Sequence, residues 1–287
     1  MTRSAVGVRT ERATPAPEQT SRAGWFSRPA FRLPRAREIG LAVAVPLLLL
    51  LGWELASRAG TLNPLFFPPP SVVARAWWDL WLSGGLATDL RVSLQRLLAG
   101  FVLGAVPGVA LGMAMGLWTP VRKAVLPTVT ALYPVPRIAI LPLVLVVFGI
   151  GESGKLFMVG FSVFFLMLLQ TMAGVRGIEP VMLDVARSLR ASRLRQYLTV
   201  ALPGSLPAIF TGVRLALGFA LIVIVGTEFL ASNQGVGALI WRSYQVLDIE
   251  TMYAGLATTA LIGWGLNLFV DVLERIALPW RAAGRHV

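Results

Sequence analysis

Cysteine is absent from this sequence, and its single histidine, His286, lies near the C-terminal end. Disulfides, thiolate nucleophiles and cysteine-ligated metal sites are therefore excluded, and a histidine-based site is not expected. Charged residues are also scarce, at 14% of the 287 residues against about 25% in soluble globular domains. We therefore predict no catalytic residues and no metal site in this chain.

Apolar residues take the place of the missing charge and make up 56% of the chain. A soluble protein this apolar could not cover its surface with polar groups, whereas runs of about 20 apolar residues can span a bilayer. The sequence predicts an all-α polytopic membrane protein of about six transmembrane helices. We place these helices at about 39–57, 92–118, 124–149, 153–175, 207–228 and 252–274.

The charge is unevenly distributed along the chain. Residues 1–37 carry eight arginines and no long apolar run, which predicts a disordered cytoplasmic tail. A membrane domain follows at 38–280, with a polar loop at about 176–203, and 281–287 form a second short tail.

Eighteen basic residues fall on the side of the termini and four in the opposite loops. This asymmetry predicts a multi-pass protein of the cell membrane with both termini in the cytoplasm, and it explains the net charge of +12 better than nucleic-acid binding does.

Glycine recurs at every fourth position of the second predicted span. This spacing puts a smooth strip on one helix face, where another helix can approach closely. Glycine is also common in membrane helices generally, but strict register favours the packing role. The five glycines are Gly100, Gly104, Gly108, Gly112 and Gly116.

The third predicted span is interrupted by prolines, at positions 127, 134, 136 and 142. Each proline removes a backbone donor and disfavours helix at the preceding residue, so we expect a broken helix. Arg137 lies inside this segment, where a charge is costly unless it faces a cavity or a partner. It is a candidate for orienting an anionic substrate, and pairing with a carboxylate or with backbone carbonyls is the alternative. Glu228 and Arg214, near the two ends of the fifth span, are further substrate-pathway candidates, with packing or pairing as the alternative.

The segment Gly149–Leu156 resembles a phosphate-binding P-loop. It lacks the Ser or Thr that would hold Mg²⁺, because Leu156 occupies that position. We therefore expect this chain to bind no nucleotide.

The polar loop reads GIEPVMLDVARSLRASRLRQYLTVALPGSLP. Pro180 suits a first helical turn, and Val181, Val185 and Leu189 repeat at four-residue spacing, which predicts a short amphipathic helix. Such a helix can be a docking surface or can lie on the membrane, and the spacing alone does not choose between the two.

The same loop resembles the EAA loop of ABC-importer permeases. Asp184-Val185-Ala186 stands for Glu-Ala-Ala, and Val200-x-Leu202-Pro203 follows at the family's spacing. Arg190 departs from the pattern, since the family has glycine where the backbone bends. A left-handed turn at arginine costs on the order of 1 kcal/mol, so the sequence leaves the bend after Leu189 open.

The resemblance extends over roughly residues 50–280. Residues 67–73 look like the family's entry to its second span. Residues 133–143, 148–149, 227–229 and 235–237 are similar to the subgroup that imports nitrate, sulfonates, taurine and related anions.

The resemblance implies the type I ABC-importer permease fold and import of a small anionic solute. It implies a second permease subunit, most simply a homodimer, with two cytoplasmic ATPase subunits and an extracytoplasmic solute-binding protein. ATP and Mg²⁺ would be used by the ATPase, and no cofactor by this chain. The residues expected to couple to the ATPase are Asp184, Ala186, Arg187, Leu189, Arg190, Ser192, Arg193, Leu202 and Pro203.

Two other functional classes fit the sequence less well. An ion-coupled secondary transporter also uses broken helices, but it needs carboxylates in the membrane, and the spans offer few. A membrane enzyme would lack the residues for its chemistry.

Overall fold

The structure is a computed structural model that describes residues 36–279. The predicted tails at 1–37 and 281–287 therefore fall almost entirely outside the described residues. The chain divides into two compact units between Leu49 and Leu50, within helix α1 (Ala36–Arg58). The larger unit, from Leu50 onward, contains every site discussed below.

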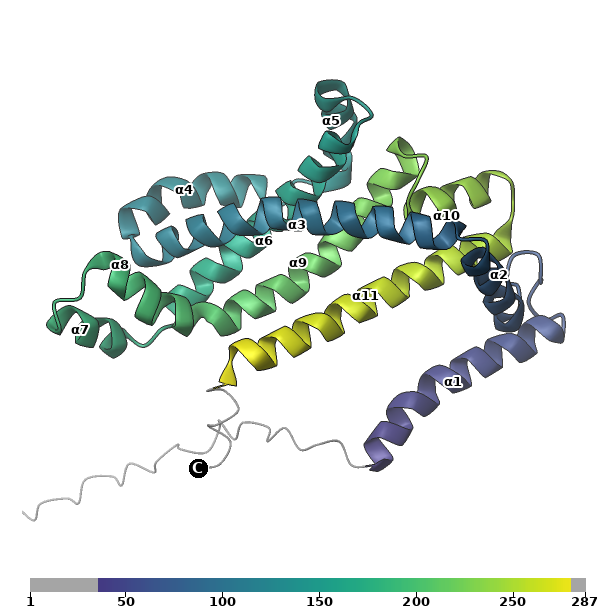
Figure 1. Cartoon of the computed structure of the whole chain (residues 1–287), viewed down its shortest axis with the longest axis horizontal. Helices are drawn as coiled ribbons and strands as arrows, with labels where there is room; N and C mark the ends of the chain where they lie inside the picture. The colour runs from purple at the N-terminus through teal and green to yellow at the C-terminus, as the bar shows by residue number, and fades with distance from the viewer. Residues whose placement is uncertain (1–35, 280–287) are drawn as a thin grey trace, which may run out of the picture. The chain divides into compact units, whose positions relative to one another are not determined.

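Every regular element among residues 36–279 is a helix, as the all-α prediction requires (Figure 1). After α1 the order is α2 (Pro70–Leu82), α3 (Gly85–Leu117), α4 (Thr119–Leu132), η1 (Arg137–Ile140), α5 (Leu141–Phe148), α6 (Glu152–Arg176), α7 (Pro180–Ser188), α8 (Arg193–Gln196), η2 (Tyr197–Ala201), α9 (Leu202–Ala231), α10 (Val236–Gln245) and α11 (Ile249–Ala277).

Four stretches of the described chain are long and apolar enough to cross a membrane: α3, α6, η2 with α9, and α11. The bent pair formed by α4 and η1–α5 makes a fifth if it counts as one span. The predicted number of six is therefore approximate. The region at 58–91, between the first two predicted spans, contains α2 and the start of α3. Hydropathy marks only the apolar part of a helix, which explains why α3 begins at Gly85 and not at the predicted residue 92.

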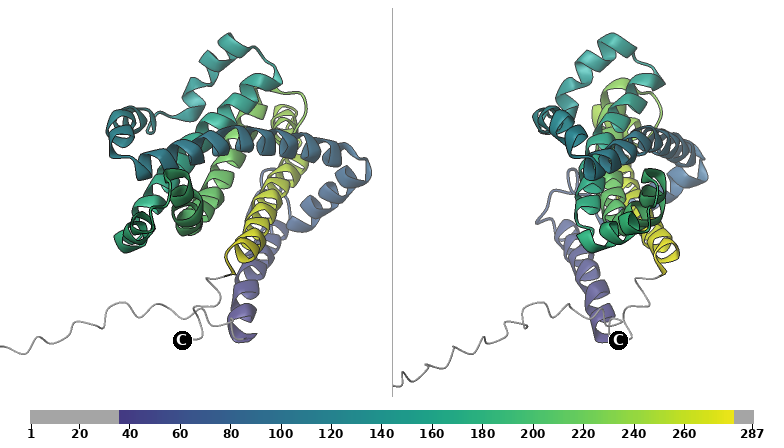
Figure 2. Two further views of the ribbon diagram at one scale, coloured as in Figure 1. Left: turned by 60° about the vertical axis from the view of Figure 1, so that its left-hand side comes forward. Right: turned by 90° about the vertical axis from the view of Figure 1, so that its left-hand side faces the viewer.

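The predicted interruption of the third span is confirmed. The helix axis turns by 84° between Thr119–Leu132 and Arg137–Phe148 (Figure 2). Pro134 and Pro136 lie in the break, where their missing N–H groups and restricted neighbours end one helix before the next begins.

The core is built by α3 against α6 and by α6 against α9. The five glycines of α3 all face α6: a Cβ added at Gly104 would lie 2.1 Å from the carbonyl oxygen of Gly160, and one at Gly100 would lie 2.6 Å from Cβ of Val159. The two backbones are therefore nearly in contact, an approach that only glycine permits.

Candidate functional site

Helix α7 and the turn that follows it form the first candidate site. Pro180 occupies the first helical position, and α7 ends at Ser188. Arg190 then adopts φ +52°, the left-handed conformation typical of glycine. Its N–H donates to the carbonyl of Arg187 at 2.9 Å, and the N–H of Ala191 donates to the carbonyl of Ala186 at 3.0 Å. These two bonds make a Schellman turn, so the bend that the sequence left open is present, with arginine in the place of glycine.

The outer face of α7 is apolar and exposed. Val181, Met182, Val185 and Leu189 are 67%, 55%, 54% and 77% exposed. Beside them Asp184 accepts a hydrogen bond from Arg187 at 2.9 Å, and both side chains are 64% exposed. An apolar strip with a charged edge is typical of a surface that another protein covers.

Ala186 differs from the other residues expected to couple to the ATPase, because it is only 8% exposed. It lies on the inner side of α7, the helix that contacts α8 and η2. The buried position of Ala186 does not favour direct contact with an ATPase. Its small side chain instead lets α7 pack against α8 and η2.

Three of the remaining residues expected to couple to the ATPase, Ser192, Leu202 and Pro203, make contacts within the loop or at the start of α9. The Ser192 hydroxyl accepts a hydrogen bond from the N–H of Arg195 at 3.3 Å, and the Gln196 amide donates to the carbonyl of Ala191 at 2.9 Å. Leu202 and Pro203 begin α9, with Leu202 packed against the core. The side chain of Arg193 lies outside the described residues.

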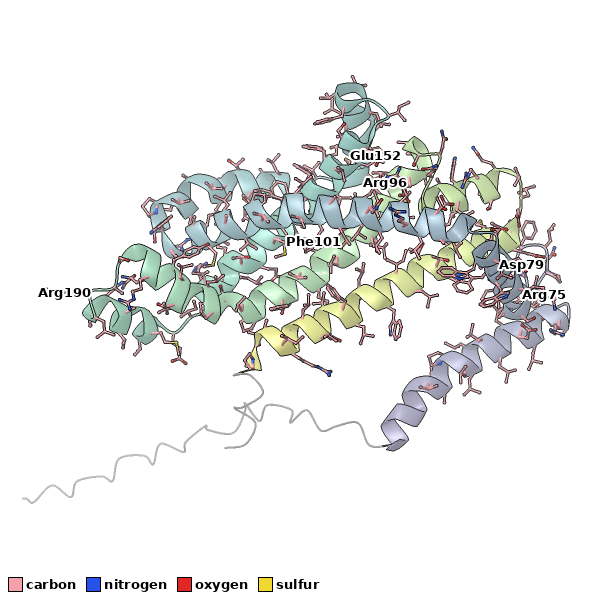
Figure 3. The ribbon with its side chains drawn as sticks, viewed as in Figure 1. Arg75, Asp79, Arg96, Phe101, Glu152 and Arg190 are labelled. Carbon is pink, nitrogen blue, oxygen red and sulfur yellow. The ribbon has the colours of Figure 1, made fainter. Side chains whose placement is uncertain are left out.

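A second polar cluster, at the other end of the bundle, was not predicted from the sequence. Figure 3 shows Arg190 beyond α7 at one end and Arg96 with Glu152 toward the other. The Arg96 guanidinium donates to Glu228 at 2.8 Å and to both carboxylate oxygens of Glu152 at 2.7 Å. Glu152 also accepts from Lys155 at 3.0 Å. The signal in the sequence was an arginine near the start of a glycine-rich span, where a charge needs a partner.

Glu228 is fully buried in this cluster. Its carboxylate accepts hydrogen bonds from the Ser93 hydroxyl at 2.7 Å and from the N–H of Gly237 at 3.0 Å. These bonds, with that of Arg96, tie the turn between α9 and α10 to α3. The position fits pairing, the alternative that the sequence left open.

Arg214 and Arg137 lie in two further, separate environments. Arg214 forms ion pairs with Asp271 and Glu274 of α11. The Arg137 guanidinium lies 5.2 Å from the ring centre of Tyr133 and 6.0 Å from that of Phe219. Its Nη2 is buried and has no hydrogen-bond partner among the described residues. Among residues 36–279, Arg137 thus has aromatic neighbours but no carboxylate or carbonyl partner that the structure shows.

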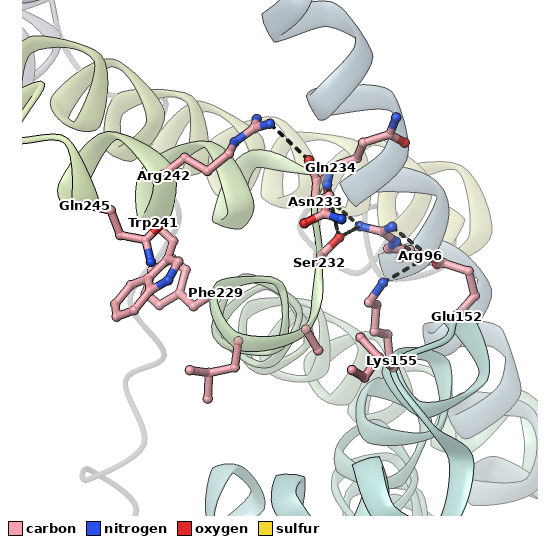
Figure 4. Close-up of a pocket in the computed structure, with 13 residues that line it drawn as sticks. Arg96, Glu152, Lys155, Phe229, Ser232, Asn233, Gln234, Trp241, Arg242 and Gln245 are labelled. Atoms are coloured by element: carbon pink, nitrogen blue, oxygen red, sulfur yellow. Dashed lines mark hydrogen bonds and ion pairs between the residues drawn. The ribbon is translucent and has the colours of Figure 1, made fainter.

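The P-loop-like segment does not form a phosphate cradle. Lys155 is buried, 4% exposed, inside α6, and its ammonium is held by Glu152 one turn earlier. The lysine of a P-loop lies beside a cradle of backbone N–H groups, whereas Lys155 lies within helix α6 and its ammonium points into the cluster around Arg96 (Figure 4).

Known proteins similar to this chain identify its family. The family model for the binding-protein-dependent transport system inner membrane component matches residues 108–282. The taurine transport system permease protein TauC of Escherichia coli (strain K12) is 32% identical over 87% of this chain and 93% of the relative. SsuC of the same strain, named as a permease protein for aliphatic sulfonates transport, is 36% identical over 80% of this chain and 88% of the relative.

A solved bacterial ABC transporter that imports the acidic polysaccharide alginate superimposes with a TM-score of 0.60 at 16% identity, over 83% of this chain and 96% of that chain. At this identity the likeness shows a shared fold. The family match covers more than half of the chain and includes α7 and its turn. This chain therefore belongs to the binding-protein-dependent transport system inner membrane components and is the permease subunit of an ABC importer, a transport subunit that works with a separate ATPase and a solute-binding protein.

Proposed function

We propose that two copies of this chain form the pathway for a small organic anion of the sulfonate class. The relatives named for taurine and aliphatic sulfonates support this class of solute. The Nη2 group of Arg137 supports it independently, because a half-buried guanidinium with an unused donor is suited to a sulfonate or carboxylate oxygen.

The observation that carries the coupling part of the proposal is the exposed apolar face of α7. In this proposal two cytoplasmic ATPase subunits each cover one α7, and ATP binding draws the two permease copies between inward-facing and outward-facing states. The solute-binding protein delivers the anion to the opposite end of the bundle, where α10 lies (Figure 1). This chain holds no nucleotide; ATP and Mg²⁺ belong to the ATPase.

Uptake in whole cells tests the solute class. Cells that lack other sulfonate importers and express the complete importer should accumulate ethanesulfonate, and ATP depletion should abolish the uptake. Accumulation that survives ATP depletion but follows an ion gradient would contradict the proposal in favour of a secondary transporter.

The role of Arg137 is tested in the same assay. Arg137→Gln removes the charge but keeps a polar side chain of similar length, so ethanesulfonate uptake should fall about tenfold or more, the loss of one charge-assisted contact. The exposed Arg75→Gln on α2 is the matched control and should leave uptake unchanged. Wild-type uptake by Arg137→Gln, at equal expression, would show that Arg137 does not contact the solute.

A further inference from the structure

The cluster around Arg96 opens onto a cavity of about 610 Å³ (Figure 4), toward the end of the bundle remote from α7 (Figure 3). Three cationic residues line it, Arg96, Lys155 and Arg242, together with the polar Asn233 and Gln234 and one carboxylate, Glu152. Glu228 and Asp89, which pair with Arg96 and Arg242, balance two of these positive charges, and Glu152 balances the third. A small sulfonate or carboxylate fits easily into this volume.

The two cations that bind Glu152 are buried, whereas Glu152 is not. The side chains of Arg96 and Lys155 are 8% and 5% exposed, and that of Glu152 is 58% exposed. Water can solvate the Glu152 carboxylate if it swings away. Without Glu152, Arg96 would keep only Glu228 and Lys155 would keep no carboxylate partner among the described residues, and an unpaired buried charge is strongly unfavourable. This position therefore needs an anion, but the anion need not be Glu152.

The cationic site is also held rigidly without help from Glu152. The far side of the Arg96 guanidinium donates to Glu228 at 2.8 Å, to the Ser232 hydroxyl at 3.1 Å and to the carbonyl of Gln234 at 2.6 Å. The near side presents its Nε and Nη2 as a fork, beside the ammonium of Lys155. A fork and an adjacent ammonium supply three donors, which match the three oxygens of a sulfonate.

We propose that Arg96 and Lys155 form an exchangeable anion subsite at the mouth of the pathway, in which the sulfonate or carboxylate group of the cargo replaces Glu152. The inference rests on the proposed import of a small anion. The exchange conserves charge, since one monoanion leaves the cations as another arrives. The N-terminus of α6, where Glu152 lies, favours either anion through the helix dipole. Glu152 thus keeps the site neutral between transport cycles and competes with the cargo.

The test is binding of radiolabelled ethanesulfonate to the purified importer, permease with ATPase, without ATP. Glu152→Gln keeps the shape of the side chain but removes the competing charge, so the dissociation constant should fall about tenfold. Lys155→Met should raise it about tenfold, and Lys155→Arg should restore it. Glu250→Gln is the matched control: it removes an exposed carboxylate at the start of α11, next to α10, and should have no effect.

An unchanged or weaker affinity in Glu152→Gln, or equal tightening in Glu250→Gln, would overturn the subsite. An absence of ethanesulfonate binding in both the wild type and Glu152→Gln would overturn it as well. Whole-cell uptake separates this failure from failure of the proposed function. Cells that import ethanesulfonate although Glu152→Gln leaves binding unchanged would retain the function and lose the subsite.

Discussion

Arg190 adopts a backbone conformation that is normally reserved for glycine. Its φ of +52° closes the Schellman turn after α7, and the turn is held by two backbone hydrogen bonds and not by the arginine side chain, which is exposed. A left-handed residue with a Cβ costs about 1–2 kcal/mol. The surrounding loop therefore imposes the bend against the preference of the residue.

Replacing Arg190 by glycine should stabilise this turn by about 1 kcal/mol, because the Cβ strain disappears. Hydrogen exchange of the peptide spanning residues 180–200 should slow accordingly. Arg195→Gly makes the same change within helix α8, where glycine is unfavourable, and exchange should become faster. Faster exchange in Arg190→Gly would mean that the arginine side chain itself supports the turn.

At the scale of elements, the glycine strip joins α3 to α6. Gly104→Ala would drive a Cβ into the backbone of Gly160, so the helices must separate, at a cost of about 1–3 kcal/mol. Gly218→Ala is the matched control, because a Cβ there meets nothing within 4 Å. Thermal unfolding of the detergent-solubilised protein should show a lower Tm for Gly104→Ala and an equal or higher Tm for Gly218→Ala. Equal Tm values in the two variants would refute the packing argument.

Substitution by aspartate should have different effects at two neighbouring residues of α7, Val185 and Ala186. Val185→Asp places a charge on the exposed apolar face, so it should weaken ATPase binding about tenfold or more and leave the Tm of the permease unchanged. Ala186→Asp buries a carboxylate against the chain itself and should lower the Tm. Co-purification of the ATPase and thermal unfolding measure the two effects. Normal ATPase recovery with Val185→Asp would exclude this face as the docking surface.

Several of these elements could be predicted from the sequence because their signals are local. The glycine register predicted the strip on α3, the prolines predicted the break before Arg137, and the valine spacing predicted α7. The inward position of Ala186 could not be predicted, because it depends on where α8 and η2 lie. The cluster of Arg96 was missed for a similar reason: its partners are 56 and 132 residues away in the sequence.

At the scale of the whole molecule, the distribution of basic residues predicts that α7 faces the cytoplasm and α2 the outside. The chain has no cysteine, so a single introduced cysteine would be its only site of labelling. In intact cells a membrane-impermeant maleimide should label Asp79→Cys on α2 and leave Ser192→Cys unlabelled until the cells are opened. Both positions are exposed on the protein. Labelling of Ser192→Cys from outside would invert the topology and remove α7 from the reach of an ATPase.

The close contact of α3 with α6 also limits how the permease can move. The carbonyl of Gly160 fills the space of the missing Cβ at Gly104, so the two helices can neither slide nor roll past one another without a clash. We expect α3 and α6 to move together as one rigid body. The chain can then bend at residues 133–136, between α4 and η1, because prolines have already interrupted the helix there. We therefore expect a conformational change that begins at α7 to move α3 and α6 as a unit, and the segment that carries Arg137 to change its angle to α4 at this break.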